Sequence, residues 1–441
     1  MPDDKPHYLI VSYHFRPSSA VGARRPTALK SFLEANGARV SVMRGVESGV
    51  DAAGDEATDL SVVFPKKRLS ATWRALKARR RGNGPMGPMA PATVQATNAE
   101  RDIAWIRDGL RAWNSYLQSD KLWLARFAWK LRGLPRSTRY SAIIASGPPL
   151  ASYVAGLMAA ERFAAPLVLD FRDPWFLHRE FPRGTHPAHA YFGGREDRLG
   201  QRCIDRASLL VAASPGIADH LTRTYSVGST PLTIVRNGYD EESIIDSAAP
   251  TGRLEMIYAG TLYYNRNPFP FLEALARFVT SDGIERDRMR FRLVGKCDRW
   301  NGLSVAAWIE EQGLGDVVSV NGLVPHDKLT KLIEASNVLV NFSQGQPLQI
   351  PAKSYEYLAS KRDVFCIAES DSDVARLHEE AGYGDVVAPN DGDAMRETLA
   401  RLYRKYVAQP GAGDALPDTS RYRRSAQFRE LLPALAAVDD T

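Results

Sequence analysis

A lysine and a glutamate stand three residues apart where a helix is predicted to begin, in the segment QIPAKSYEYLAS (349–360). Pro351 suits the first helical turn, because the N–H that proline lacks has no intrahelical partner there. Lys353 places a cation in that same turn, where exposed N–H groups already carry partial positive charge. Glu356 shares the face of the lysine. This unfavourable cation makes the segment a candidate binding site.

Two further loops place arginines after predicted strands. In SYHFRPSSAVGARRP (12–26), Gly22 precedes Arg24 and Arg25, so a ligand that approaches the backbone closely would then meet positive charge. Arg266 follows Gly260 and stands just before a predicted helix, whose N-terminus favours an anion. For both loops, the alternative that the arginines are solvated surface cations stays open.

The elements that must position these side chains recur in a regular order. Short apolar or β-branched runs alternate with stretches of helical length, beginning with HYLIVSYHF, ARVSVMRG, SAIIASG, APLVLDFRD and ASLLVAAS. After a break near residues 226–231, a second series contains LEMIYAGTL, MRFRLVGK, VVSVNGLV, NVLVNFS, RDVFCIAES and GDVVAP. This alternation is typical of parallel sheets that helices cover on both faces.

We therefore predict an α/β protein with two Rossmann-like, doubly wound domains that face a cleft. The first domain is predicted over residues 1–228 and the second over 229–410, and we expect a helix in the tail (411–441) to cross back to the first domain. We also expect the domains to rotate about their link when a ligand binds. In such sheets ligands bind beyond the carboxyl ends of the strands, where the loops above emerge.

Positive charge is concentrated in one segment of the chain. The 441 residues carry a net charge of +6, whereas residues 66–139 contain 17 basic and 4 acidic side chains, a net +13. The same segment contains Trp105, Trp113, Trp123 and Trp129. We interpret it as a basic, Trp-rich insertion in the first domain that binds an anionic membrane surface. The alternative, with the tryptophans in the core and the basic run in a disordered loop, stays open.

Several classes of protein do not fit the composition. The three cysteines are far apart and offer neither a disulfide framework nor metal-ligand spacing. The first residues lack the layout of a signal peptide, and no apolar run reaches the roughly 18–20 residues of a spanning helix. The GNGPMG run (82–87) matches a dinucleotide motif in spacing only, because it follows a basic stretch rather than a strand. We expect a cytoplasmic protein without a metal site.

Taken in order, these segments resemble a known family. Outside residues 66–139, the chain is similar to the GT-B-fold glycosyltransferases of glycosyltransferase family 4. The resemblance rests on the order and spacing of FRPSSAVGARRP, LVLDFRDPW, IVRNGYDEE, YAGTLYYNR, FRLVGK, VNGLVPHDKL and IPAKSYEYLAS. It implies transfer of a sugar from a nucleotide diphosphate sugar, with a UDP-sugar favoured, with retention of configuration and without metal or cofactor.

The resemblance places the donor in the second domain. Arg266 and Lys353 would hold the diphosphate and stabilise its charge as the sugar departs, so both are predicted to be catalytic. Glu356 would accept hydrogen bonds from the ribose. The negative ligand would then make the lysine at the helix start favourable. The donor-binding residues implied are Gly22, Asn237, Gly260, Arg266, Lys353 and Glu356.

On the acceptor side, the resemblance implies Arg24, Arg25 and Asp173. Asp173 ends a first-domain strand in LVLDFRDPW and is the candidate acceptor-side catalytic carboxylate. A helix cap, or a carboxylate held by Arg172, is the alternative. The implied acceptor is a lipid-linked or surface-polysaccharide precursor of a bacterium, such as a polyprenyl-diphosphate glycan. The enzyme would reach it as a peripheral protein on the inner face of the cytoplasmic membrane, with no nucleic-acid partner.

The chain departs from the family pattern at identifiable positions. Leu348 stands where the family commonly has a second glutamate, and Ser146 and Gly147 stand where a histidine is often found. These departures leave open which sugar is moved. Two other functions also stay open. A non-hydrolysing sugar-nucleotide epimerase would need acid–base carboxylates and no acceptor, and a non-catalytic binding protein of the same fold would use the basic segment alone.

Overall fold

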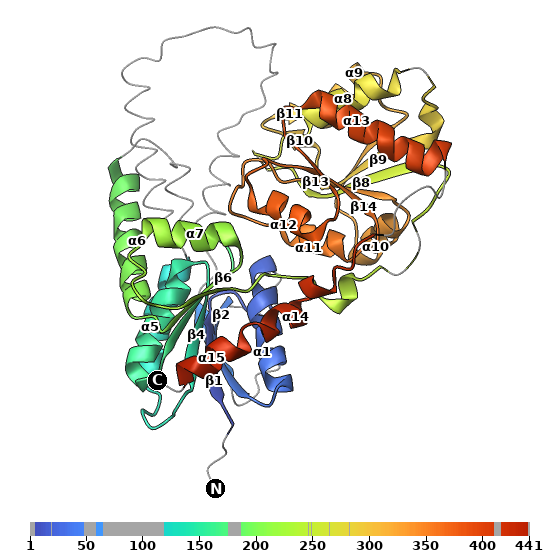
Figure 1. Cartoon of the computed structure of the whole chain (residues 1–441). Coiled ribbons are helices and arrows are strands. Elements are labelled where there is room, and N and C mark those ends of the chain that lie inside the picture. Colours follow the sequence, from blue (N-terminus) through green and yellow to red (C-terminus); the bar gives the residue numbers. More distant parts are fainter. Residues whose placement is uncertain are drawn as a thin grey trace, which may run out of the picture. The chain divides into compact units, whose positions relative to one another are not determined.

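The computed structural model describes residues 5–18, 20–47, 59–64, 119–174, 187–245, 247, 249–263, 265–281, 283–409 and 416–439. Residues 66–118 of the basic segment therefore lie outside the described residues. The chain divides into two compact units (Figure 1). Unit 1 comprises residues 1–213, 220–233 and 431–441, and unit 2 comprises residues 214–219 and 234–430.

Unit 1 is built on a seven-stranded sheet with the order β3-β2-β1-β4-β5-β6-β7, whose pairs from β3 to β6 are parallel. Every residue of β1 and β4 is buried, as expected for strands covered on both faces. The strands are β1 (His7–Ser12), β2 (Arg39–Glu47), β3 (Asp59–Phe64), β4 (Ala142–Gly147), β5 (Leu167–Phe171), β6 (Leu209–Ala212) and β7 (Leu232–Ile234). The strand order reverses between β1 and β4, which makes this the topological switch point.

The helices of unit 1 connect these strands. α5 contacts β1, β4 and β5 and packs on α4 and α6. The first residues of α7 belong to unit 2. The helical elements are η1 (Val21–Ala23), α1 (Arg24–Ala35), α4 (Ser119–Arg132), α5 (Leu150–Phe163), α6 (Pro187–Asp205), α7 (Pro215–Thr224) and α15 (Leu432–Asp439).

Unit 2 is built on a six-stranded parallel sheet with the order β12-β9-β8-β13-β14-β15. Its strands are β8 (Leu254–Thr261), β9 (Met289–Lys296), β12 (Val318–Asn321), β13 (Val338–Phe342), β14 (Asp363–Ile367) and β15 (Asp385–Val387), with a hairpin of β10 (Arg299–Trp300) and β11 (Leu303–Ser304). Its α-helices are α8 (Phe269–Val279), α9 (Val305–Glu311), α10 (His326–Glu334), α11 (Ala352–Leu358), α12 (Asp373–Ala381), α13 (Gly392–Tyr403) and α14 (Arg424–Arg429). Single turns are η2 (Glu241–Ser243), η3 (Arg286–Arg288), η4 (Arg404–Ala408) and η5 (Ser420–Tyr422).

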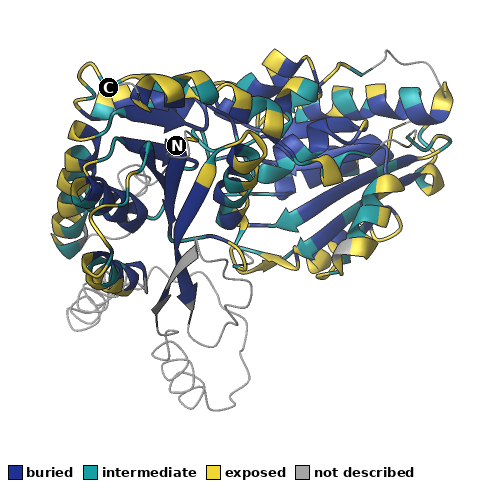
Figure 2. Ribbon diagram, turned by 90° about the horizontal axis from the view of Figure 1, so that it is seen from below, coloured by how far each residue is buried: buried dark blue, intermediate teal, exposed yellow. Residues whose placement is uncertain are grey.

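The core of unit 2 lies on both faces of its sheet. Met256 and Tyr258 of β8 pack in the cluster that contains α8 and α13, whereas Ile257 between them packs in the cluster that contains α11 and α12. This alternation follows from the two-residue period of a strand. Figure 1 shows α8, α9 and α13 on one side of the sheet and α10, α11 and α12 on the other. Figure 2 shows buried central strands and helices that are exposed on their outer sides.

The parallel sheets with helices on their faces confirm the predicted α/β class. The end of the chain contributes to both units, because α14 belongs to unit 2 and α15 belongs to unit 1, where it contacts β4 and β6. Within the described ranges, no helix has the length and apolar character needed to cross a membrane.

Candidate functional site

Two loops of unit 2 that contain or lead into predicted site residues lie against each other. They follow β8 and β13, which are neighbouring parallel strands, so both leave the sheet at its carboxyl edge. Asn265 donates from Nδ2 to the carbonyl oxygen of Gly345 over 3.1 Å, and Gln344 donates from Nε2 to the carbonyl oxygen of Asn267 over 2.7 Å. The structure therefore joins the loop of Arg266 to the loop that leads into α11.

Arg266 is half-buried in this junction and has neutral neighbours. Its Nη2 donates to Oε1 of Gln346 over 3.3 Å, and its Cζ lies 5.0 Å from the ring centroid of Tyr263. Its Nε is buried without a hydrogen-bond partner. Among the described residues, no carboxylate forms an ion pair with this arginine. A partly desolvated guanidinium of this kind suits an anionic ligand.

Lys353 and Glu356 form an ion pair on α11. Nζ lies 3.6 Å from Oε2, and the two side chains are 33% and 26% exposed. Glu356 thus offsets the charge that Lys353 brings to the helix start. An ion pair this exposed contributes little stability, so a ligand can replace either partner at small cost. The assignment of Glu356 to a ribose stays a prediction.

Gly260 at the end of β8 has a packing role. A Cβ at this position would lie 2.8 Å from the hydroxyl oxygen of Tyr258, and a Cβ at Gly295 would lie 2.1 Å from the carbonyl oxygen of Gly260. Burial raises the pKa of Tyr258 to about 12, and the charge of Arg266 opposes that shift. A side chain at position 260 would meet Tyr258, and the donor-binding role of Gly260 stays a prediction.

In unit 1, the two adjacent arginines of the first loop differ in their surroundings. Arg25 is buried and binds Asp170 through Nε and Nη2, at 3.0 and 2.8 Å from Oδ1. Ser146 donates to Oδ2 of the same carboxylate over 2.7 Å. Arg24 is exposed. Asp170 therefore already neutralises Arg25, an ion pair that the sequence analysis did not foresee.

Asp173 follows β5 at the carboxyl edge of the same sheet and is half-buried. Arg172, the residue before it, is 4% exposed and donates from Nη2 to the carbonyl oxygen of Pro148. Gly22 lies directly against the guanidinium of Arg172. The structure thus brings the loop of Gly22 and the strand end of Asp173 together within unit 1.

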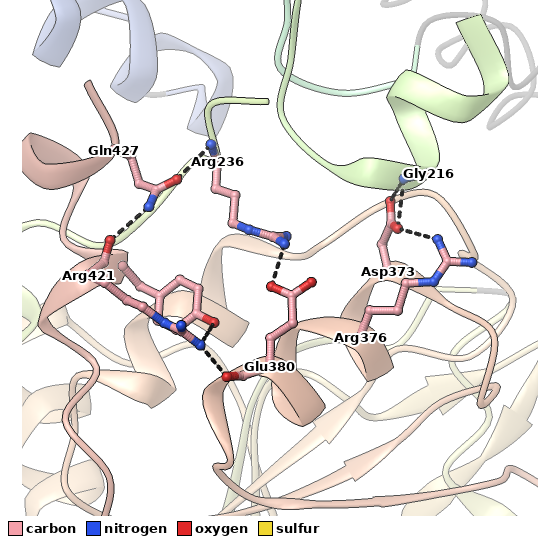
Figure 3. Close-up of polar contacts among 8 residues, drawn as sticks. Gly216, Arg236, Asp373, Arg376, Glu380, Arg421 and Gln427 are labelled. Atoms are coloured by element: carbon pink, nitrogen blue, oxygen red, sulfur yellow. Dashed lines mark hydrogen bonds and ion pairs between the residues drawn. The ribbon is translucent and has the colours of Figure 1, made fainter. Parts of the chain in front are cut away.

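Asn237 lies in the segment after β7, which is fastened to C-terminal residues of unit 2. Arg424 donates from Nη1 to the carbonyl oxygen of Asn237 over 2.5 Å. The backbone amide of Arg236 donates to Oε1 of Gln427 over 3.0 Å, and the Arg236 side chain places Nη2 2.6 Å from Oε2 of Glu380 (Figure 3). The Asn237 backbone therefore has a structural role, and its contact with a donor stays a prediction.

The sequence analysis missed several side chains that hold the site loops, namely Asp170, Asn265, Gln344, Gln346 and Glu369. Glu369 accepts hydrogen bonds from the amide of Gly345, at 3.0 and 3.1 Å from its two carboxylate oxygens. Asp170 and Glu369 share a signal, since each is an acidic residue at the end of a buried run, where burial demands a partner. Gln346 carries no such signal. The described residues contain no group of three or more His, Cys, Asp or Glu side chains that could hold a metal ion.

Comparisons with known proteins agree with this architecture. The family model described as Glycosyltransferase Family 4 matches residues 93–243. No curated protein matches the chain in a sequence comparison. Among solved structures, a sucrose-phosphate synthase from Thermosynechococcus elongatus is 16% identical with a TM-score of 0.61, and the alignment covers 98% of this chain and 99% of that one.

Two further structures are similar over almost their whole length. A lipopolysaccharide outer core galactosyltransferase in its apo form is 13% identical with a TM-score of 0.55, over 98% of this chain and 99% of that one. An α,α-trehalose-phosphate synthase (UDP-forming) from Burkholderia vietnamiensis is 12% identical with a TM-score of 0.53, over 99% and 98%. These likenesses show that the chain has the GT-B fold of glycosyltransferases, and over residues 93–243 it resembles glycosyltransferase family 4.

Proposed function

We propose that the protein transfers a sugar from a nucleotide diphosphate sugar, most favourably a UDP-sugar, to a lipid-linked or glycan acceptor. Transfer retains the configuration of the sugar and uses neither a metal ion nor a cofactor. The observation that carries the proposal is the loop junction of unit 2. There Arg266, which pairs with no described carboxylate, lies in a loop bonded to the loop that leads to Lys353. Two cations at the carboxyl edge of a parallel sheet suit a diphosphate.

The chemistry follows from where charge develops. Breaking the sugar–phosphate bond leaves an oxocarbenium-like sugar and adds negative charge to the departing diphosphate. Arg266 and Lys353 would stabilise that charge, which is usually the largest catalytic contribution. Once the diphosphate offsets the charge of Lys353, the carboxylate of Glu356, which lies 3.6 Å from the lysine, would accept hydrogen bonds from the ribose hydroxyls.

The acceptor side is proposed for the carboxyl edge of unit 1. Asp173 supplies the carboxylate there. Arg24 suits an anionic acceptor better than Arg25 does, because Arg24 is exposed while Asp170 neutralises Arg25. A phosphate-bearing lipid-linked acceptor would meet both a carboxylate and a cation at this edge.

The outer face of α4 supports a peripheral membrane location for a protein otherwise proposed to be cytoplasmic. Trp123 is buried and packs against Phe127 with the rings tilted and their centroids 5.3 Å apart, so the core interpretation holds for this tryptophan. Trp129 is 78% exposed and Leu122 is 50% exposed. Arg126 shares their helical face. An exposed tryptophan and leucine beside a cation suit an anionic lipid interface.

A donor screen tests the proposal. The protein is incubated with labelled UDP-, GDP- and ADP-sugars, with and without a polyprenyl-diphosphate-linked glycan and with or without EDTA. We expect label in the acceptor from one UDP-sugar, unaffected by EDTA. Arg266→Gln should lower this transfer by roughly 100- to 1000-fold. The matched control Arg290→Gln, at an exposed arginine of β9, should not lower it.

Other outcomes of the screen would contradict the proposal in different ways. Conversion of the nucleotide sugar without an acceptor would indicate an epimerase. Absence of both turnover and nucleotide binding would indicate a non-catalytic protein of the same fold.

A further inference from the structure

At the switch point of the unit 1 sheet, hydrogen bonds join β1 and the turn after it to β4 and α5. Ser12 at the end of β1 donates from Oγ to the carbonyl oxygen of Ser146 in β4 over 3.2 Å. The amide of Tyr13 donates to Oγ of Ser152 in α5 over 3.0 Å. These bonds connect the end of β1 and the turn after it to β4 and α5, and the carboxyl end of β5 lies next to β4 in the sheet.

Arg172 joins β5 to these turns through both its backbone and its side chain. Its amide donates to the carbonyl oxygen of Gly147 over 3.1 Å, and its Nη2 donates to the carbonyl oxygen of Pro148. The side chain is nearly fully buried. Burial, and then the charge of Arg172, lower the pKa of His14 in the turn after β1 to about 4. Arg172 therefore ties the end of β5 to the end of β4 and to the turn after β4.

Gly22 is the position at which this guanidinium meets the turn after β1. A Cβ on Gly22 would lie 1.8 Å from Nη1 of Arg172 and 2.5 Å from its Cζ. Contacts this short are impossible, so any side chain at position 22 would displace the guanidinium. The guanidinium of Arg172 occupies the space that a side chain at position 22 would need, and the sequence does not indicate this contact because 150 residues separate the two.

We propose that Arg172 is a positioning residue that fixes the Gly22 turn and the adjacent Asp173 in the acceptor-side geometry of this transferase. The inference rests on the proposed function. Displacing the guanidinium would release the Gly22 turn from the strand end that carries Asp173. Misplacing a reacting group by about 1 Å costs roughly 100-fold in rate. UDP affinity should change little, because the proposed diphosphate and ribose ligands lie in unit 2; the contact with Arg172 replaces the donor-binding role that the resemblance implied for Gly22.

A double-mutant cycle tests the inference. We expect Gly22→Ala and Arg172→Ala each to lower kcat by roughly 100-fold while the Kd of UDP stays within about twofold. In the Arg172→Ala background, Gly22→Ala should cost less than about twofold more, because the guanidinium that its methyl group would meet is gone. Gly133→Ala is the matched control, since a Cβ there lies 3.5 Å from its nearest neighbour, an ordinary contact.

The outcomes separate this inference from the proposed function. Independent losses that multiply in the double variant would overturn the role of Arg172, as would a Kd of UDP that weakens in proportion to kcat. A wild-type protein that neither binds UDP nor transfers sugar would overturn the proposed function itself. In that case, a loss of stability on Gly22→Ala that disappears in the Arg172→Ala background would still support the contact between the two residues.

Discussion

At the scale of single residues, the partner of an arginine decides whether that arginine can bind a ligand. Arg25 and Arg266 look alike in sequence, since each follows a strand and a glycine. Arg25 is neutralised by Asp170, with Nη2 2.8 Å from Oδ1, whereas Arg266 contacts the neutral amide of Gln346 at 3.3 Å. An arginine that already has a buried carboxylate partner is a structural residue first. Arg266 is therefore the cation on which the donor assignment depends.

A buried histidine at the start of β1 makes the stability of the protein depend on pH. Arg39 donates to Nδ1 of His7 over 2.8 Å, so that nitrogen carries no proton, and Nε2 lies 2.9 Å from Oγ of Ser41. Burial, and then the charge of Arg39, lower the pKa of His7 to about 4. An unfolded chain takes up this proton near pH 6.5. The contribution of His7 is complete above pH 6.5 and is lost as the pH falls from about 6.5 to about 4.

The substitution His7→Gln should therefore make the free energy of unfolding depend less steeply on pH in the acid range. In urea unfolding, the free energy of unfolding should fall more between pH 7 and pH 5 for the wild type than for the variant. The difference should be up to about 1.4 kcal/mol per pH unit. Between pH 7 and pH 8, which lies outside the window, the two proteins should respond equally. If the wild type and His7→Gln lose the same free energy of unfolding between pH 7 and pH 5, His7 is not held neutral in the folded protein.

At the scale of elements, α4 separates its side chains into two faces with different roles. Trp123, Phe127 and Leu131 are buried at four-residue spacing, while Leu122 and Trp129 are exposed. The inner face holds the helix on unit 1, and the outer face is the part of the proposed membrane surface that the structure describes. The basic run at 66–81 lies outside the described residues.

Liposome flotation tests the outer face of α4. Wild-type protein should float with vesicles that contain anionic lipid and less with zwitterionic vesicles. Leu122→Ser/Trp129→Ser should lower partitioning at least roughly tenfold, because burial of one large apolar side chain contributes about 1.5–3 kcal/mol. The control pair Leu303→Ser/Leu323→Ser, at exposed leucines of unit 2, should float like the wild type. If the α4 variant floats as well as the control variant, α4 is not part of the membrane-binding surface.

The elements were more predictable from sequence than the contacts between their loops. Long apolar runs such as HYLIVS and DVFCI can only be buried strands here, and they form β1 and β14. The run DLSVVF was not predicted as a strand, and it forms β3. The pairs Arg25–Asp170 and Gly22–Arg172 could not be predicted, since their partners come from distant loops that only the sheet order brings together.

At the scale of the whole molecule, the proposed reaction is divided between the two units. Unit 2 contributes the loop junction of Arg266 and the ion pair of Lys353, which together would hold the donor. Unit 1 contributes the edge of Asp173 and the exposed face of α4, which together would receive the acceptor. Each assignment rests on contacts within one unit, so each can be tested separately.

The donor assignment is the central claim, and calorimetric titration with UDP tests it most directly. The account predicts that UDP binds equally with and without EDTA. Lys353→Ala should weaken binding by about 1.5–3 kcal/mol, the usual contribution of a hydrogen bond to a charged group. Lys331→Ala, at an exposed lysine of α10, should bind like the wild type. Absence of UDP binding, binding that EDTA abolishes, or an unchanged affinity in Lys353→Ala would contradict the account.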